Sequence, residues 1–361
     1  MKRLVLLGAG HAHALVLNAM AGQPMAGTDV VLVSPVVQAP YSGMVPGWLG
    51  GQYRWDEIVA DFGALATRAG ARLLPMGAVA LDPAARRLTL SDGQDLPYDL
   101  LSINIGSTLR PPPVPAGVRM LPLRPLAALR DGFERALHEL PAIGRGRAAP
   151  IRVTTVGGGA AGVEALLATV NRLRALGCAV TGRLVTRAGR LLPGMAPGAA
   201  RRAQQHFDAL GITCSLGTAF DDAMAADSDL VLWAAGAQPH DFHAASGLAL
   251  TEDGFIAIDD QLQSRSHPQV FASGDCAGFS PALPKAGVYA VRQGPLLLAN
   301  LRAALAGRPL QRYRPQWEFL ALLATGDGTA IMSWNGLSTE GRWVWRWKDR
   351  IDRGFMRRLA G

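Results

Sequence analysis

Residues 4–13 read LVLLGAGHAH, and this stretch decides the fold. Four apolar residues, Leu4–Leu7, are typical of a short buried strand in a parallel sheet, and they run directly into a turn that contains Gly8 and Gly10. Apolar residues then recur at helical spacing. A strand, a glycine turn and a helix hold a dinucleotide pyrophosphate, because the glycines let the backbone approach it and the helix start offers free N–H groups. The usual third glycine is His13 here, so the pattern is incomplete.

The composition fits a soluble α/β protein better than a disordered or fibrous one. Of the 361 residues, 49% are hydrophobic, 18% are charged and 42 are glycines, and the length allows two or three domains. The formal net charge is +8, carried almost wholly by arginine, but the basic residues are scattered except at the C-terminus. We therefore expect no nucleic-acid partner.

The cysteines exclude two kinds of site. Cys178, Cys214 and Cys276 lie far apart and form no C-x-x-C pair, so neither a disulfide framework nor a metal site is expected. Few, unpaired cysteines suit a reducing compartment, which favours a cytoplasmic protein. Glycine and histidine break the apolar start of the chain too soon for a signal peptide, and no stretch approaches the roughly eighteen apolar residues of a membrane span.

The chain after the first helix continues the dinucleotide-binding pattern only in part. A second strand over 29–33 ends at Ser34 and Pro35, where an NAD-binding unit would carry an acidic residue for the ribose. The glycine- and proline-rich stretch 39–51, which includes Ser42, is either a plain connector or a backbone cradle beside a flat ligand.

Further strands and one helix follow. Residues 72–96 predict a small antiparallel meander, and a buried strand over 98–105 ends at Gly106. A helix is expected over 126–140 and a linker over 144–150.

The opening pattern repeats more faithfully from residue 151. A strand there is followed by Gly157, Gly159 and Gly162, so all three glycines of G-x-G-x-x-G precede a helix. The next strand ends at Arg187, where NAD binders carry an acidic residue. An arginine at that place can accept a 2′-phosphate, so this unit either prefers NADP or has lost its nicotinamide cofactor.

Residues 268–278 read PQVFASGDCAG, a short strand followed by Gly274 and Asp275. With these residues the chain resembles the two-dinucleotide-binding flavoproteins of the pyridine nucleotide-disulfide oxidoreductase superfamily. The two glycine turns, the strand ends at Gly106 and Gly236, and the final Gly-Asp pair occur in that family's order and cover essentially the whole chain. The resemblance implies bound FAD, with the Asp275 carboxylate on its ribityl chain. It also implies an α/β fold with two Rossmann-like three-layer dinucleotide-binding domains, the second inserted in the first.

The resemblance also implies how the chain is divided. Residues 1–115 and 246–308 would form the FAD-binding domain, and residues 116–245 an NAD(P)-binding-like domain. A small C-terminal α+β segment, 309–361, would follow, with a membrane contact or a homodimer contact left open.

Details of the sequence separate the branches of the superfamily. The cysteine spacing disfavours a disulfide reductase and a sulfide:quinone-type oxidoreductase. Residues 284–294, PKAGVYAVRQG, resemble a helix of the type II NADH:quinone dehydrogenases, with Gly287 and Arg292 in place of two glutamines. The stretches GHAH, PYSGMVPG and GRWVWRWKDRIDR resemble most closely the flavoprotein module fused to selenide, water dikinase.

These resemblances imply an FAD-dependent oxidoreductase that accepts hydride from NAD(P)H on flavin N5 and passes electrons to a quinone or another small acceptor. The alternative is a flavin-binding accessory module linked to selenium metabolism, with little turnover of its own. Glu164 would reach between nicotinamide and isoalloxazine, although a buried glutamate also suits the capping of a neighbouring loop. Lys285, before a helix expected over 286–298, would stabilise the reduced flavin or else lie solvated.

The candidate site residues fall into two groups. The catalytic candidates are Glu164 and Lys285. The cofactor-binding candidates are Gly8, Gly10, His11, Ala12, Ser34, Pro35, Ser42, Val79, Gly106, Gly157, Gly159, Gly162, Arg187, Gly236, Gly274, Asp275, Lys285 and Ala286.

The C-terminal stretch 341–361 predicts a basic amphipathic helix. Its apolar residues recur every four positions, at Trp343, Trp347, Ile351, Phe355 and Leu359. Arginines crowd the remaining positions. The helix either makes a peripheral contact with the inner face of the cytoplasmic membrane or packs on the core of the protein.

Overall fold

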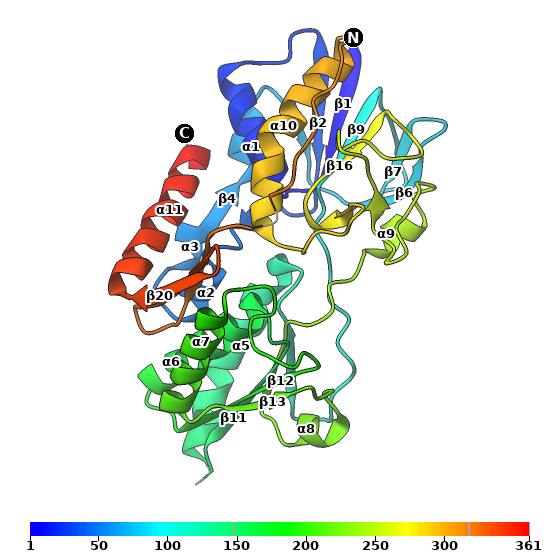
Figure 1. Ribbon diagram of the computed structural model, residues 1–361. Coiled ribbons are helices and arrows are strands. Elements are labelled where there is room, and N and C mark those ends of the chain that lie inside the picture. Colours follow the sequence, from blue (N-terminus) through cyan, green and yellow to red (C-terminus); the bar gives the residue numbers. More distant parts are fainter. Residues whose placement is uncertain (147–148, 317, 361) are drawn as a thin grey trace.

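The computed structural model describes residues 1–146, 149–316 and 318–360, and the chain forms two lobes, each built on a five-stranded parallel sheet (Figure 1). The first sheet has the order β16-β9-β1-β2-β5, with strands Val270–Ala272, Leu100–Ile103, Lys2–Leu7, Thr28–Val33 and Arg72–Leu74. The second has the order β10-β14-β11-β12-β13, with strands Arg119–Pro122, Leu230–Trp233, Ile151–Val156, Val180–Thr186 and Thr213–Leu216. The predicted α/β class with two Rossmann-like units is confirmed.

All strands of the second sheet come from the part of the sequence between β9 and β16, two strands of the first sheet. The chain leaves from β9, beside the central strand of the first sheet, and enters the edge strand β10 of the second. It returns from β14, beside the central strand of the second sheet, to the edge strand β16 of the first. The two crossing segments pair with each other, because Thr108 and Gln238 exchange backbone hydrogen bonds of 2.9 Å. The exact domain boundaries remain a prediction.

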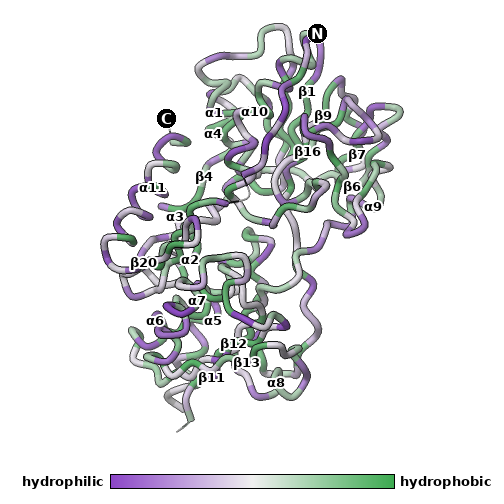
Figure 2. Tube along the Cα trace, in the orientation of Figure 1, coloured by the Kyte–Doolittle hydropathy of each residue, from purple (hydrophilic) through white to green (hydrophobic). Residues whose placement is uncertain are grey.

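The central strands are apolar because helices cover the sheets. Leu4–Leu7 of β1 is at most 3% exposed, and Figure 2 shows the hydrophobic trace of the strands inside each lobe. In the first lobe the main helices are α1 (His11–Gly22), α4 (Phe62–Arg68) and α10 (Gly287–Leu305). In the second they are α5 (Leu126–Arg145), α6 (Ala160–Ala175) and α7 (Pro197–Leu210).

Two expected helix ends were too early. Helix α5 was expected to stop at 140 but continues through Pro141, because Leu140 is fully buried and Ile143 packs against the same core. It therefore occupies the start of the expected linker, of which residues 147–148 lie outside the described residues. Helix α10 continues to Leu305 because Leu301 is buried in the core of the first lobe.

Several short elements lie outside the two main sheets and their covering helices. The short helices are α2 (Val45–Leu49), α3 (Trp55–Ile58), α8 (Asp222–Ala226), α9 (Asp241–Ala244) and the 3-10 turn η1 (Gly274–Cys276). Two-stranded pairs are formed by β3 (Gln38–Pro40) with β4 (Val59–Asp61) and by β15 (Ile256–Ala257) with β17 (Ala277–Gly278).

The expected meander is present but begins later. Strands β6 (Ala78–Asp82), β7 (Arg87–Leu90) and β8 (Asp95–Pro97) form it. Its predicted start at residue 72 was wrong, because β5 instead pairs in parallel with β2. Leu73 and Leu74 pack against the core of the first lobe, which outweighs the local hairpin pattern.

The C-terminal segment contacts both lobes. It consists of an antiparallel sheet, β18 (Ala321–Ala324), β19 (Ala330–Trp334) and β20 (Leu337–Gly341), and of helix α11 (Arg342–Ala360). The sheet packs on α6 and α7, whereas α11 lies beside α1 and β4 (Figure 1). The guanidinium of Arg68 donates to the carbonyls of Leu359 and Ala360, and so caps the end of α11.

The predicted apolar stripe on α11 is divided between two faces. Trp343, Trp347 and Ile351 are 54%, 36% and 44% exposed, whereas Phe355 and Leu359 are 8% and 4% exposed. A helical turn takes 3.6 residues, so positions four apart rotate by about 40° per step and the ends of the series diverge by about 160°. The buried face consists of Val344, Lys348, Asp352, Phe355 and Leu359.

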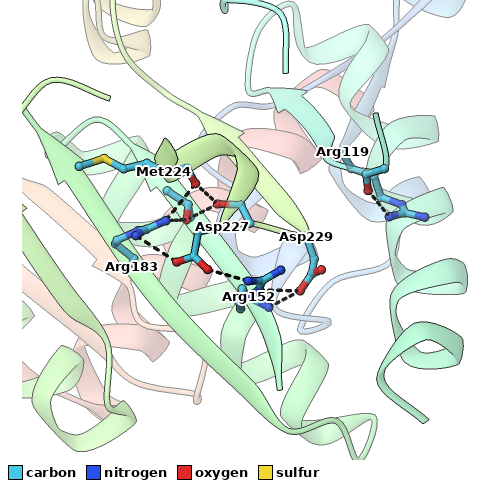
Figure 3. A network of polar contacts seen from close by, with 9 residues as sticks. Arg119, Arg152, Arg183, Met224, Asp227 and Asp229 are labelled. Atoms are coloured by element: carbon cyan, nitrogen blue, oxygen red, sulfur yellow. Dashed lines mark hydrogen bonds and ion pairs between the residues drawn. The ribbon is translucent and has the colours of Figure 1, made fainter. Parts of the chain in front are cut away.

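A polar network closes the second sheet at its amino end. The Arg152 guanidinium donates to Asp227 at 2.6 Å, and the Arg152 N–H donates to the Asp229 carboxylate at 2.7 Å (Figure 3). Arg183 donates to Asp227 at 3.4 Å and to the carbonyl of Met224 at 3.0 Å. Ligands of parallel sheets bind at the opposite, carboxyl end, so this network serves the fold.

Candidate functional site

The first glycine turn follows β1 and begins α1. Gly8 has a φ of +99°, which glycine adopts at low cost, and Gly10 precedes α1 without a side-chain cap. The Asn104 side chain enters the turn, because its Oδ1 accepts the N–H groups of Ala12 and His13 at 3.1 and 3.3 Å. Gly10 is required here, since a Cβ would lie 2.1 Å from that oxygen.

His13 occupies the place of the missing third glycine and stabilises the turn. It is fully buried, with Nδ1 2.8 Å from the Gly8 carbonyl and Nε2 2.8 Å from the Ser102 hydroxyl. A carbonyl only accepts, so Nδ1 carries the hydrogen and Nε2 accepts from the hydroxyl. Burial lowers the pKa of His13 to about 4, which keeps the ring neutral at pH 7. The incomplete motif therefore still forms a fixed turn.

The remaining N–H groups of the turn fit a diphosphate. Among the described residues, the N–H groups of Ala9, Gly10 and His11 have no hydrogen-bond acceptor, and the first turn of α1 contains no acidic residue. The His11 ring accepts the N–H of Ser42 at 3.2 Å, which brings the loop after β3 beside the turn. Free N–H groups at a helix start favour phosphate oxygens, so this site suits the diphosphate of a dinucleotide.

Asp275 lies at the carboxyl edge of the first sheet, directly after β16. Gly274, with a φ of +68°, turns the chain, and its N–H donates to Gln293 Oε1 at 2.7 Å. The Asp275 carboxylate accepts hydrogen bonds from Arg124 at 2.5 Å and from the Ser107 hydroxyl at 3.4 Å. A carboxylate at this edge suits the hydroxyl groups of a ribityl chain, and that role stays a prediction.

Lys285 lies before α10, but its ammonium group has protein partners. Its Nζ donates to the Ala277 carbonyl at 2.8 Å and lies 3.5 Å from the centre of the Phe255 ring. Burial lowers the pKa of Lys285 below its ordinary value. The alternative that Lys285 is a solvated loop lysine is therefore wrong. Its stabilisation of the reduced flavin stays a prediction.

The other first-lobe candidates lie along the loops at the carboxyl edge or beside it. The Ser34 hydroxyl closes its own turn by bonding to both the N–H and the carbonyl of Val36. Ala286 precedes α10, and Pro35 and Val79 are exposed. Gly106 has a φ of +73°, and in the second lobe Gly236 has one of +72°, so the strand ends that they follow turn alike.

The second glycine turn has the geometry that the complete motif predicts. Gly157 has a φ of +121°, and Gly159 precedes α6 without a side-chain cap. Gly162 lets α6 pack against the turn, because a Cβ there would lie 1.9 Å from the Gly157 carbonyl oxygen. Arg187 is exposed just after β12, where a 2′-phosphate of NADP would lie. This arrangement suits a nicotinamide dinucleotide.

Glu164 is buried where α6 meets the C-terminal segment. Its Oε1 accepts the N–H of Ala324 in β18 at 2.7 Å. Burial raises the pKa of Glu164 to about 7, and nearby Asp352 raises it further, whereas Lys348 and the Ala324 N–H lower it. The structure thus gives Glu164 the capping contact that was one alternative, and its role beside nicotinamide stays a prediction.

A buried ion pair on α11 faces the loop that follows β3. Lys348 Nζ lies 2.6 Å from Asp352 Oδ2, and both side chains are only 6% exposed. Nζ also donates to the Gly43 carbonyl at 2.5 Å. The Tyr41 hydroxyl bonds to Asp352, and the Tyr41 ring stacks on Phe355 at a centroid distance of 4.4 Å. Through these contacts α11 fixes the loop beside the first glycine turn.

A groove of about 550 Å³ lies between α11 and the segment from α3 to α4. Val59, Ala60, Met356 and Leu359 form its apolar part, and acidic and arginine side chains line the rest. Ala60 and Leu359 also line a smaller inner cavity. That cavity is lined further by Gly10, His11, Tyr41 and Phe355. The groove therefore adjoins the cavity beside the first glycine turn, because both share Ala60 and Leu359.

We expect the substitution Glu164→Gln to stabilise the protein at pH 8 but not at pH 4.5. A folded pKa of about 7 lies above the ordinary 4.5, so ionisation of Glu164 destabilises the fold increasingly as the pH rises through that interval. The amide keeps an oxygen for the Ala324 N–H but has no charge to bury. The difference in unfolding free energy between the proteins should grow by about 3 kcal/mol, and urea unfolding at both pH values measures it. A difference that does not change with pH would contradict this.

Several residues at the site were missed from the sequence. Asn104, Arg124, Lys348 and Asp352 all reach it from distant segments. Their only local signals were a polar residue at a strand end and charged residues four apart on a helix. No group of three or more metal-ligating side chains occurs in the part of the chain that the structure describes.

Comparison with known proteins gives a family match and several oxidoreductase relatives. The model of the pyridine nucleotide-disulphide oxidoreductase family matches residues 2–294. Ferroptosis suppressor protein 1 of Xenopus tropicalis is 34% identical over 110 residues, which are 30% of this chain and 29% of that protein. This chain therefore matches less than a third of that relative's length.

Two broader matches extend over most of the chain. Alternative NAD(P)H-ubiquinone oxidoreductase C1 of Arabidopsis thaliana is 25% identical over 363 aligned positions, covering 87% of this chain and 69% of that protein. The structure of sulfide:quinone oxidoreductase from Aquifex aeolicus superposes with a TM-score of 0.80 at 15% identity, covering 99% of this chain and 91% of the other. At that identity the superposition shows a shared fold.

Proposed function

We propose that this chain is an NAD(P)H dehydrogenase that reduces a quinone. The chain belongs to the pyridine nucleotide-disulphide oxidoreductase family of FAD-dependent enzymes. The observation that carries the proposal is the pair of glycine turns, each at the start of a helix without a side-chain cap and each at the carboxyl edge of a parallel sheet. One turn suits the diphosphate of FAD and the other that of NAD(P)H.

FAD, held by the residues of the first lobe, would supply the hydride-accepting and electron-transferring chemistry that amino-acid side chains lack. The chain's own residues bind and orient. The N–H groups of Ala9, Gly10 and His11 bind the diphosphate of FAD, and Asp275 binds its ribityl hydroxyls. The turn at Gly157 binds NAD(P)H, and Glu164 lies on the helix that follows this turn.

The groove beside α11 supports a quinone as the acceptor. A quinone has an apolar ring and tail and two polar oxygens, and the groove joins an apolar interior to charged side chains at its edge. The plant relative is named as an NAD(P)H-ubiquinone oxidoreductase and the Aquifex protein as a sulfide:quinone oxidoreductase.

We expect anaerobic NADH and NADPH to bleach the flavin absorbance near about 450 nm at comparable rates. Arg187 offers a cation to the 2′-phosphate, so Arg187→Ala should slow NADPH severalfold and leave NADH unchanged. Stopped-flow absorbance measures both rates, and adding a short-chain quinone should restore the absorbance. A colourless protein that binds no added FAD would contradict the proposal, and a hundredfold preference for NADH would contradict the role of Arg187.

A flavin-binding accessory module linked to selenium metabolism is the second candidate. It is favoured by the absence of an acidic residue at Thr186 and Arg187, where NAD binders hold the ribose. A protein that binds FAD tightly but is bleached by neither nucleotide would favour this candidate over the dehydrogenase.

We propose further that the C-terminal segment makes a peripheral membrane contact. Its exposed apolar side chains are Trp334, Leu337, Trp343, Trp347 and Ile351. They lie on the β19–β20 hairpin and the outer face of α11, beside the exposed arginines at 342, 346 and 350. No helix in the described ranges is long and apolar enough to cross a bilayer. Tryptophans beside arginines suit the surface of an anionic membrane.

We expect the double substitution Trp343→Ser, Trp347→Ser to reduce flotation with anionic liposomes. The loss should persist in about 1 M salt, because salt screens the arginines over about 3 Å but leaves apolar insertion intact. Val79→Ser removes another exposed apolar side chain, far along the sequence on β6, and serves as the matched control. Equal flotation of the double variant and the control would exclude this contact.

A further inference from the structure

Arg124 joins the two lobes at the edge of the proposed flavin site. It follows β10, the edge strand of the second sheet, and Leu123 before it still bonds to Trp233 of β14. The Arg124 side chain leaves that sheet and reaches Asp275, which follows β16 of the first sheet. The two residues are 151 positions apart in sequence. A side chain of one lobe thus holds a carboxylate of the other.

The guanidinium has three acceptors, each from a different segment of the first lobe. Nη1 donates to Asp275 at 2.5 Å and to the Ser107 hydroxyl at 2.6 Å, and Nη2 donates to the Lys285 carbonyl at 3.2 Å. The Arg124 and Asp275 side chains are 28% and 16% exposed. A planar guanidinium with several acceptors gives a carboxylate one preferred orientation, which a flexible ammonium does not.

Asp275 has no other cationic partner among the ion pairs of the described residues. Its remaining side-chain contact in the same range is the Ser107 hydroxyl. Without Arg124 the carboxylate would gain rotational freedom and would lose the one cation that forms an ion pair with it among the described residues, at a partly buried edge. Either change reduces its ability to accept hydrogen bonds from cofactor hydroxyls in a fixed geometry.

We propose that Arg124 is a positioning residue for the flavin, which acts by holding the Asp275 carboxylate from across the two lobes. The proposal rests on the proposed function, because it assumes that FAD binds the first lobe. It makes the affinity of that lobe for FAD depend on a residue of the other lobe. Arg124 itself is assigned no contact with the flavin.

The test measures the dissociation constant of FAD by flavin fluorescence on adding FAD to protein freed of cofactor. Arg124→Gln should weaken FAD binding about tenfold or more. Asp275→Asn should weaken FAD binding by at least as much. In the Asp275→Asn background, Arg124→Gln should raise the dissociation constant by less than about twofold, because the two residues act through one contact. Arg124→Lys should recover part of the loss, because an ammonium group can still donate to Asp275 but lacks the planar fork that also donates to Ser107 and to the Lys285 carbonyl.

Arg119→Gln is the matched control. Arg119 lies on β10, the strand that precedes Arg124. Its side chain is 29% exposed, and it pairs with Glu139 of α5 at 2.6 Å. It should leave FAD binding unchanged. This control breaks an ion pair on the strand that leads to Arg124. It therefore separates a general loss of stability from the positioning effect.

Two results would overturn the proposal while the proposed function stands. One is a wild-type protein that binds FAD and an Arg124→Gln variant that binds it equally well. The other is an Arg124→Gln effect that persists undiminished in the Asp275→Asn background, which would mean that Arg124 binds the cofactor directly. A wild-type protein with no affinity for FAD would overturn both this proposal and the proposed function. A folding defect in Arg124→Gln would leave Arg124→Lys to give the same readout.

Discussion

Replacing Gly162 with alanine is expected to slow flavin reduction by NAD(P)H at least about 100-fold, while FAD stays bound. A Cβ at this position would lie 1.9 Å from the Gly157 carbonyl oxygen, and the clash is with backbone, so no side chain can move aside. Helix α6 must therefore shift away from the glycine turn that we propose binds the nucleotide. A 100-fold loss corresponds to about 2.7 kcal/mol, within the range of costs for overpacking a tight contact.

Stopped-flow reduction with NADH and NADPH measures the loss, and the flavin spectrum shows that FAD is retained. Gly189→Ala is the matched control, because a Cβ there meets open space and the glycine has no positive φ. The first lobe should be unaffected, since the substitution lies in the second. Normal reduction by Gly162→Ala would mean that the second turn does not bind the donor.

Replacing Lys348 with methionine is expected to destabilise the protein by about 3–5 kcal/mol. The substitution leaves the Asp352 carboxylate buried without its ammonium partner, while the Gly43 carbonyl loses a donor. Burial already raises the pKa of Asp352 and Lys348 lowers it, so loss of the lysine raises this pKa further. The destabilisation should consequently be larger at pH 8 than at pH 5, because more of the unpaired carboxyl must stay ionised at the higher pH.

Urea unfolding followed by tryptophan fluorescence measures this effect. The double substitution Lys348→Met, Asp352→Leu is the informative control, because an apolar pair of similar size avoids burying a lone charge. It should recover most of the lost stability. If the double variant were as unstable as the single one, the packing of α11 rather than the ion pair would decide the stability.

The two glycine turns and the central strands that precede them were predictable from the sequence because they depend on local backbone requirements. A glycine that must take a positive φ, such as Gly157, or that must allow a close backbone contact, such as Gly162, marks its own position. Buried parallel strands are equally local, since each is an apolar run such as Leu4–Leu7. These short stretches indicated the α/β class, and their order along the chain carried the family resemblance that implied two Rossmann-like domains.

Contacts between distant segments were not predictable in the same way. The Asn104 side chain enters a turn that lies about 90 positions earlier in the sequence. Lys348 reaches a carbonyl that is 305 positions away in sequence. Nothing in the residues around these side chains distinguishes them from ordinary surface polar groups. The prediction of a single apolar stripe on α11 was wrong for a different reason. Residues four positions apart rotate progressively around a helix of 3.6 residues per turn, so the series does not stay on one face.

The order in which the two sheets are completed has a consequence for synthesis on the ribosome. The second sheet has all its strands once Trp233 has emerged, whereas the first sheet waits for β16 at Val270–Ala272. The lobe that begins the chain is therefore the later of the two to acquire its full sheet. Until then β9 has an unpaired edge, and domains that wait in this state depend on chaperones more than those that close at once. The inserted lobe therefore has its complete sheet outside the ribosome before the lobe that begins the chain does.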